Sequence, residues 1–324
     1  MGAHTESSVT VGEPTLARSA NRHRVCDYLG MTKTSAKDTK KARPRVERVS
    51  DLLRLPIGPV DLDAIDTGAT PGCDGSKSTG QKALAVLGPR LADLQERLFA
   101  EGKSGGSRSV LLVLQGMDTS GKGGTLRHVV GQVDPQGVTI HSFKAPTREE
   151  QSHDFLWRIK HALPSPGLIG VFDRSHYEDV VVARVNGLVE RRTWQRRYST
   201  INRFEQALVT EGTTVVKCFL HISKKESRDR LLRRLDKTDK LWKFNPGDID
   251  SRTEWDALKE AYADALERCN TEFAPWHVIP ADHKWYRNWA IMNILVEQLE
   301  ALKVEWPAAE FDVEEQRNRL LASE

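Results

Sequence analysis

Residues 111 to 125 read LLVLQGMDTSGKGGT, an apolar stretch followed by a glycine-rich turn that ends in a lysine. Gly116, Gly121 and Lys122 fit the phosphate-binding loop pattern of glycine, four residues, glycine and lysine. Glycines let successive backbone N–H groups converge on a phosphate, and the following helix adds its positive N-terminal end. The segment therefore predicts a buried strand, a phosphate loop and a helix. The alternative is a glycine-rich turn with a solvated lysine.

One position of the loop departs from the pattern. The usual Ser or Thr after the lysine is a magnesium ligand, and this chain has Gly123 in its place. An acid, Asp118, lies inside the loop instead. P-loop enzymes that use ATP usually keep the hydroxyl, so its absence disfavours an enzyme that uses ATP as the phosphate donor.

A second segment, LIGVFDRSHYEDV at 168 to 180, reads as an apolar strand that ends at Asp173. A phosphate-loop enzyme places its magnesium-holding carboxylate at such a strand end. Asp118 and Asp173 together are therefore the predicted oxygen ligands of a hard cation. Arg174 can clamp phosphate with its planar fork of donors. The alternative for Asp173 is a helix N-cap.

Two basic segments follow. Residues 224 to 243 carry more than twice as many basic as acidic residues, which in a phosphate enzyme favours a lid that excludes water. A solvated helix face is the alternative. Residues 190 to 203 are also rich in arginine, and the sequence leaves open whether they line a groove for a long polyanion or are merely exposed.

Strands and helices alternate along most of the chain, which predicts a parallel five-stranded sheet with helices on both faces, an α/β fold of the P-loop kinase type with a helical lid. The expected strands are 110–114, 138–143, 168–172, 214–222 and 276–279. The expected helices are 84–102, 121–130, 149–163, 190–209, 224–243, 251–272 and 284–303.

The 324 residues carry a net charge of +3, which implies no global attraction to nucleic acid. Four cysteines lie far apart, and neither a membrane span nor a signal peptide is evident, so a cytoplasmic protein is expected. Four regions are predicted. They are a disordered tail at 1–50, in which Met31 is a second possible start, an extended wrap at 51–79, a phosphotransferase domain at 80–306 with its lid at about 223–247, and a C-terminal tail at 307–324.

At this point four segments, in order, resemble the polyphosphate kinase 2 family over roughly 80 to 305. The matching segments are QGMDTSGKGGTLR, FDRSHYEDV, RLLRRLDKTDKLWKF and TEFAPWHVIPADHKWYRNW. The pieces RSHYED and PADHKWYRN look most like the subgroup that accepts both nucleoside mono- and diphosphates. That subgroup often has Asn at the position of Asp173, and this departure leaves acceptance of AMP open. It also often has Pro at the position of Thr238, and that departure affects only the lid geometry.

The resemblance implies roles for individual residues. The implied catalytic residues are Asp118, Lys122, Asp173 and Arg174, of which Asp118 and Asp173 would manage Mg²⁺. The implied phosphate loop consists of Gly116, Thr119, Ser120, Gly121, Gly123, Gly124 and Thr125. Glu178 and Asp179 would lie near the nucleotide. The implied lid contacts to polyphosphate are Arg230, Arg234, Lys240 and Lys243.

The implied reaction moves the terminal phosphoryl group of inorganic polyphosphate to ADP or GDP, with AMP left open, and runs in reverse from ATP or GTP. The resemblance also implies a homo-oligomer, a dimer or a tetramer, with no nucleic-acid or membrane partner. One alternative is an ATP-dependent nucleoside monophosphate kinase of the thymidylate kinase type. The other is a binding protein that kept the loop and lost turnover.

Overall fold

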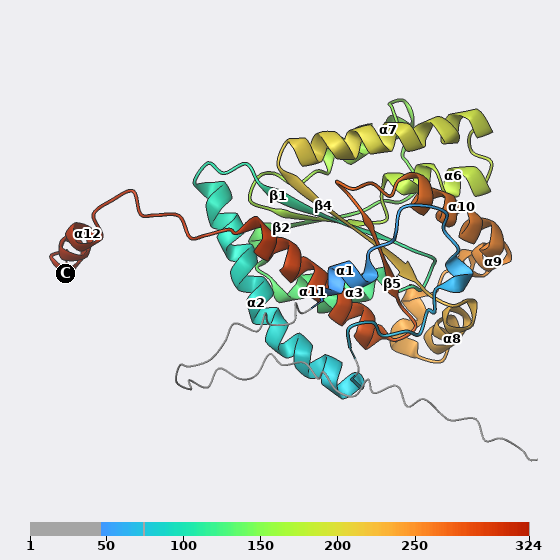
Figure 1. Cartoon of the computed structure of the whole chain (residues 1–324), viewed down its shortest axis with the longest axis horizontal. Helices are drawn as coiled ribbons and strands as arrows, with labels where there is room; N and C mark the ends of the chain where they lie inside the picture. Colours follow the sequence, from blue (N-terminus) through green and yellow to red (C-terminus); the bar gives the residue numbers. More distant parts are fainter. Residues whose placement is uncertain (1–46, 74, 324) are drawn as a thin grey trace, which may run out of the picture. The chain divides into compact units, whose positions relative to one another are not determined.

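The computed structural model describes residues 47–73 and 75–323, and within them five parallel strands form one sheet in the order β2-β3-β1-β4-β5 (Figure 1). The strands are β1 Ser109–Gln115, β2 Val138–Ser142, β3 Ile169–Asp173, β4 Thr213–His221 and β5 Trp276–Pro280. Each of the five predicted strands lies within two residues of these bounds.

β1 is the central strand of the sheet, and every one of its residues is buried. A run of Val and Leu without polar alternation suits a strand that is covered on both faces. In the parallel register, Leu114 of β1 lies opposite Asp173 of β3, and Gln115 lies opposite Phe219 of β4. The carboxyl ends of the strands thus meet at one edge, where ligands bind in open parallel sheets.

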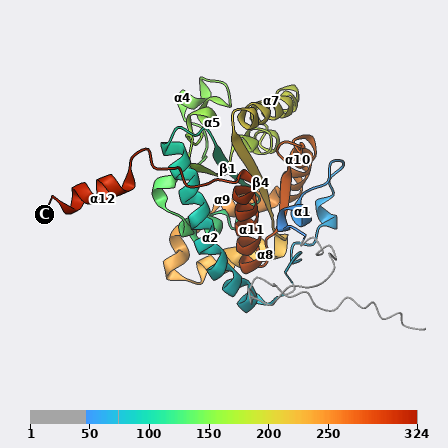
Figure 2. The same cartoon turned by 60° about the vertical axis from the view of Figure 1, so that its left-hand side comes forward.

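Helices cover both faces of the sheet, as predicted. α2 (Lys77–Lys103) and α11 (Lys284–Leu302) pack against each other on one face, together with α3 (Lys122–His128). On the other face lie α6 (Val182–Val185), α7 (Arg191–Thr210) and α10 (Trp255–Arg268) (Figures 1 and 2). The remaining short elements before the lid are η2 Val130–Gln132, η3 Pro135–Gly137 and η4 His176–Asp179.

The predicted helix 149–163 is wrong, because the structure divides it into α4 (Arg148–Gln151) and α5 (Trp157–His161). Two local side-chain bonds end the first helix and start the second. Ser152 Oγ donates to the Glu149 carbonyl at 2.7 Å, and Asp154 Oδ1 accepts from the Leu156 N–H at 3.0 Å. Such bonds compete with the helical ladder.

The lid is also more broken than predicted. α8 (Lys224–Leu235) begins at an N-cap, where Ser223 Oγ accepts from the Glu226 N–H at 3.0 Å. It is followed by the 3₁₀-helix η5 (Thr238–Lys243) and by α9 (Gly247–Thr253), so the predicted single helices at 224–243 and 251–272 are both interrupted.

The segment before α2 wraps around the domain. It contains α1 (Val49–Leu53), which begins inside the predicted tail, and η1 (Leu62–Ala64). The N–H groups of Val49 and Ser50 donate to the Glu297 carboxylate of α11 at 2.8 and 2.9 Å. Residues 1–46 of the predicted tail, Met31 among them, lie outside the described residues.

The predicted C-terminal tail contains a helix, α12 (Val313–Leu321), none of whose residues is buried. Trp306, just before it, lies with its ring 5.8 Å from the Arg97 guanidinium of α2. None of the described helices is both long enough and apolar enough to cross a membrane.

Candidate active site

The turn between β1 and α3 has the backbone of a phosphate loop. Gly116 and Gly121 have φ values of +143° and +112°, in the region that favours glycine. Thr119 adopts φ +66°, which is uncommon for a residue with a side chain. Ser120 and Thr125 are buried, and the predicted set lies in this turn and at the start of α3. The set is Gly116, Thr119, Ser120, Gly121, Gly123, Gly124 and Thr125.

Lys122, the first residue of α3, folds back across the loop. Its Nζ donates to the Gly116 carbonyl at 2.8 Å and to the Met117 carbonyl at 3.4 Å. Burial lowers the pKa of Lys122, and Asp118 opposes that shift. The ammonium therefore lies against the first two residues of the loop.

Arg174 and Asp118 meet beside the loop. Arg174 Nη2 donates to Asp118 Oδ1 at 3.1 Å, and its backbone N–H donates to the Leu114 carbonyl of β1 at 3.1 Å. Burial lowers the pKa of Arg174, but Glu178, Asp118 and Asp173 act against burial, and the net shift is upward. Arg174 therefore stays charged between the predicted carboxylates.

Glu178 faces the same cations. Burial raises its pKa, while Arg174 and Lys122 pull in the opposite direction. The amide of Gln115, in the orientation that satisfies both of its polar atoms, donates to Glu178 Oε1 at 3.0 Å. The end of β1 thus holds Glu178 near the loop.

The carboxylate of Asp179, which was predicted to lie near the nucleotide, is held by two arginines. Arg158 lies 3.4 Å and Arg197 lies 3.7 Å from that carboxylate, and Arg197 also donates to the Asp179 carbonyl at 2.8 Å. Burial raises the pKa of Asp179, opposed by both arginines. This ion pair fastens η4 to α5 and α7.

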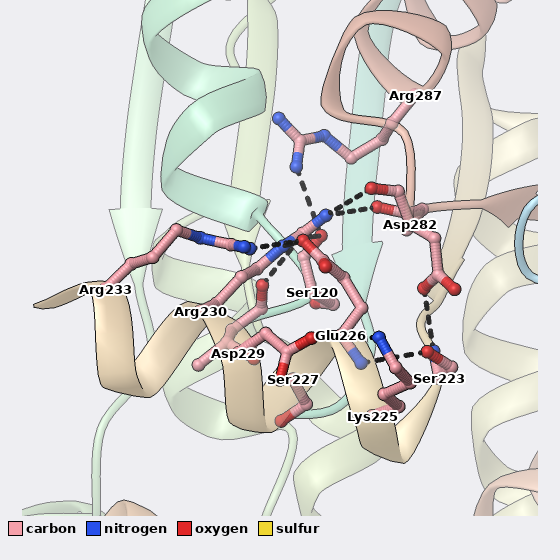
Figure 3. A network of polar contacts seen from close by, with 12 residues as sticks. Ser120, Ser223, Lys225, Glu226, Ser227, Asp229, Arg230, Arg233, Asp282 and Arg287 are labelled. Atoms are coloured by element: carbon pink, nitrogen blue, oxygen red, sulfur yellow. Dashed lines mark hydrogen bonds and ion pairs between the residues drawn. The ribbon is translucent and has the colours of Figure 1, made fainter.

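Arg230 also departs from its predicted role as a free polyphosphate ligand, since all five of its N–H donors are used inside the protein. Nη1 donates to the carbonyls of Thr119 and Ser120 at 2.8 and 3.0 Å (Figure 3). Nη2 donates to the carbonyls of Ala281 and Asp282 at 2.6 and 3.0 Å. Nε donates to the Glu226 carboxylate at 2.9 Å. Arg230 is only 6% exposed, and it braces the loop.

The other predicted lid cations differ in how free they are. Arg234 donates to the Lys243 carbonyl and to the Asp248 carboxylate, both at 3.0 Å, and so braces the lid. Among the residues that the structure describes, Lys240 forms an ion pair only with its exposed neighbour Asp239, and Lys243 is exposed.

The lid lies within electrostatic reach of the loop. The pKa of Asp248 is raised by burial and then by Asp118. A carboxylate of α9 therefore lies within electrostatic reach of the Asp118 carboxylate of the loop.

Behind the site lies a fully buried ionic network. Lys217 of β4 donates to the Glu205 carboxylate of α7 at 2.7 Å and to the Tyr177 hydroxyl at 3.0 Å. Tyr177 and His176 of η4 also contact Glu205, at 2.7 and 3.2 Å. The network ties η4, and with it the neighbouring Glu178, to the sheet.

Lys217 and Glu205 were not singled out from the sequence, and neither was Arg287 of α11, whose Nη1 donates to the Ser120 carbonyl at 3.2 Å. Lys217 offered one signal, because a lone lysine in the apolar strand TTVVKCFLH demands a buried acid. Arg287 lies within a segment that matched the family, but only the fold shows that it reaches the loop.

The arginines of α7 fall into two groups. Arg191, Arg192, Arg196 and Arg203 are exposed, and no ion pair is found for them among the described residues, whereas Arg197 is bound to Asp179.

Comparison with known proteins places this site in a family. The family profile described as Polyphosphate kinase 2 (PPK2) matches residues 74–307. The chain belongs to the polyphosphate kinase 2 family. The resemblance and the P-loop kinase-like α/β fold inferred from the sequence are thereby confirmed.

Several relatives within the polyphosphate kinase 2 family cover most of this chain. An AMP/ADP-polyphosphate phosphotransferase from Meiothermus ruber is 49% identical over 255 residues, 79% of this chain and 94% of that protein. An ADP-polyphosphate phosphotransferase from Rhodopseudomonas palustris is 38% identical, over 76% and 88% of the two chains. The crystal structure of polyphosphate kinase 2 from Arthrobacter aurescens TC1 superposes with a TM-score of 0.83 at 48% identity, over 86% of this chain and 98% of that one.

Proposed function

We propose that this enzyme transfers the terminal phosphoryl group of inorganic polyphosphate to ADP and GDP, with AMP as a further acceptor to be tested. The observation that carries the proposal is the phosphate loop with Lys122 across it and Arg174 between acids beside it. The similarity to AMP/ADP- and ADP-polyphosphate phosphotransferases over about three quarters of the chain supports polyphosphate as the donor and ADP as an acceptor. An ATP-dependent kinase of the thymidylate kinase type is not favoured.

The chemistry needs charge neutralisation more than acid–base catalysis. An acceptor phosphate oxygen, already anionic, forms a bond to the terminal phosphorus as the bridging P–O bond breaks, and polyphosphate one unit shorter leaves as an anion. Two polyanions must approach in line, so positioning and cations supply most of the catalysis. In the proposal the loop N–H groups and Lys122 hold the phosphates, and Arg174 stabilises the transferring group.

The donor set fits Mg²⁺. Magnesium is usually bound by one or two carboxylates together with substrate phosphates rather than by an all-protein cage. Asp118 and Asp173 supply two carboxylates that both act on Lys122 and Arg174, and the described residues contain no cluster of three metal-binding side chains. These two aspartates would hold Mg²⁺, which neutralises phosphate charge when bound.

Three further assignments belong to the proposal. Glu178 would lie near the nucleotide, and the exposed lid cations Lys240 and Lys243 would contact polyphosphate. Arg234 would act mainly by shaping the lid, because its guanidinium is bound to Asp248 and Lys243.

The test supplies the purified full chain and Mg²⁺ with either polyphosphate or ATP as donor. Formation of ATP or GTP from ADP, GDP and AMP is followed by chromatography. We expect product from polyphosphate, and removal of Mg²⁺ by a chelator should abolish it. Phosphorylation from ATP alone would support the thymidylate kinase alternative, and absence of turnover with either donor would support a binding protein.

We also propose a homo-oligomer, a dimer or a tetramer, as the family resemblance implies. Size-exclusion chromatography with light scattering measures this directly, and a monomer at working concentration would refute it.

A further inference from the structure

Arg287 of α11 lies under the phosphate loop as a buried cation without an acidic partner. It is 2% exposed, and no carboxylate lies within ion-pair distance of it among the described residues. Its bonds go to neutral oxygens: Nε and Nη2 donate to Asn288 Oδ1 at 3.2 and 2.8 Å, and Nη1 donates to the Ser120 carbonyl at 3.2 Å (Figure 3). A buried charge that is only hydrogen-bonded is costly to fold.

The pKa values of Arg287 and of its neighbour His128 are both lowered by nearby positive charge. Burial and the second cation of Arg230 lower the pKa of Arg287 to about 9. The pKa of His128, on α3, is lowered by burial, by Arg127 and by Arg287. The charge of Arg287 is thus felt across the base of the loop and is not cancelled there.

The loop leaves space for this guanidinium. A Cβ on Gly121 would lie 1.6 Å from Arg287 Nη1, and a Cβ on Gly124 would lie 2.6 Å from Nη2. Gly124 has no left-handed backbone conformation to explain its lack of a side chain. The three heavy atoms nearest to that Cβ all belong to Arg287, so the arginine explains this glycine.

The contact also orients one peptide group. The Ser120 carbonyl accepts from both Arg230 and Arg287, at 3.0 and 3.2 Å. In a trans peptide the C=O and the following N–H point in opposite directions. The N–H of Gly121 therefore points away from the two arginines, and no protein acceptor is found for it in the described part of the chain. Donation to the carbonyl polarises the peptide and strengthens that N–H as a donor.

We propose that Arg287 is a positioning residue whose buried charge is balanced by the phosphates held in the loop rather than by a protein carboxylate. The inference rests on the proposed function, because it takes polyphosphate as the anion. Arg287 acts through the Ser120–Gly121 peptide and through its field, without touching the reacting atoms.

Thermal unfolding of the full chain, titrated with sodium polyphosphate, tests the proposal without an activity readout. Arg287→Met keeps the length of the side chain and removes the charge. We expect the polyphosphate midpoint, the concentration that gives half of the maximal thermal stabilisation, to rise about tenfold or more in this variant. That is the scale of a lost hydrogen bond to a charged group. Its ligand-free melting temperature should stay near that of the wild type, because an uncompensated charge has been removed. Arg287→Lys should recover part of the affinity.

Arg184→Met is the matched control, since Arg184 is ion-paired to Asp264 and Glu260, both at 2.5 Å, away from the loop. It should lower the ligand-free melting temperature and leave the midpoint unchanged. A rise of less than about threefold in the polyphosphate midpoint of Arg287→Met would indicate a merely structural role and would overturn the proposal. Any larger rise supports the proposal. A wild type that polyphosphate does not stabilise would contradict the proposed function itself.

Gly124→Ala gives a second route if Arg287→Met does not fold. The added methyl should displace Arg287 and raise the midpoint, but it should have no further effect in an Arg287→Ala background, where the space is free. An equal effect of Gly124→Ala in both backgrounds would overturn the coupling.

Discussion

The proposed phosphate-binding role of Lys122 can be tested with a single substitution. Its ammonium crosses the loop to the Gly116 carbonyl at 2.8 Å, where the outer phosphates are proposed to lie. We expect Lys122→Ala to reduce turnover with polyphosphate and ADP by about 10²-fold or more, because one preorganised charge opposite the transferring group is lost. Steady-state kinetics measure this, with circular dichroism as the control for folding. Turnover near that of the wild type would exclude the assigned role.

Gly123 offers the opposite kind of test, because its surroundings are open. A Cβ there meets nothing within 4 Å, and the residue has no left-handed φ. Gly123→Ser should therefore fold as the wild type does, with unfolding free energy changed by no more than about 1 kcal/mol. Gly121→Ala should be strongly destabilised, because Gly121 has φ +112° and an added Cβ would lie 1.6 Å from Arg287. Urea titrations of both variants measure the difference. Equal stabilities for the two variants would show that the loop geometry is wrong.

The Gly123→Ser variant also tests why the hydroxyl is missing. If its absence selects the donor, Gly123→Ser should use ATP in place of polyphosphate to a greater extent than the wild type does. An unchanged donor ratio would show that donor choice resides elsewhere in the site.

At the scale of elements, the Lys217–Glu205 pair joins β4, α7 and η4. Both side chains are fully buried. Lys217→Met should lower the free energy of unfolding by about 3–5 kcal/mol, because Glu205 is left charged and unpaired in the interior. The double variant Lys217→Met/Glu205→Leu should recover much of the loss in denaturant titrations. A double variant no more stable than the single one would contradict this account.

The same pair predicts a dependence of stability on pH. Burial opposes ionisation of Glu205, but Lys217 and His176 outweigh it, and the pKa of Glu205 falls below its ordinary value of 4.5. A lowered folded-state pKa gives stability that is present above the unfolded value and is lost as pH falls through the folded value. The stability difference between wild type and Glu205→Gln should therefore shrink from about pH 5 downward. A constant difference over that range would refute the shift.

Much of the element pattern was readable from the sequence. Buried parallel strands are short apolar runs that end at a glycine or an acid, so β1 and β3 were predicted closely. The helix 149–163 was not, because the Ser152 and Asp154 side chains make local bonds that no apolar periodicity reveals.

The site divides in the same way. The loop residues, Asp118 among them, are adjacent in the sequence, and Asp173 was predicted from the strand end that it occupies. The bracing role of Arg230 was missed, since its partners Thr119 and Ser120 lie more than a hundred residues away. A basic residue that neutralises phosphate and one that binds carbonyl groups look alike until the fold is known.

At the scale of the whole molecule, the C-terminal segment adds little to the packing. α12 has no buried residue, and Phe311 and Leu320 are 61% and 72% exposed. A chain that ends at Pro307 should keep its melting temperature and its activity, because no apolar surface is uncovered. Thermal unfolding and the donor assay check both. A loss of either, or a change in oligomeric state by light scattering, would assign α12 to an interface between copies.

The strand order has a consequence for synthesis. β1 pairs with β3 and β4 rather than with β2, and the loop that follows it is braced by α8 and by Arg287 of α11. The phosphate loop is thus translated long before the residues that fix its shape. A nascent chain released before α11 has every loop residue and no formed cradle. Ribosome-bound intermediates should gain affinity for phosphate only when α11 emerges.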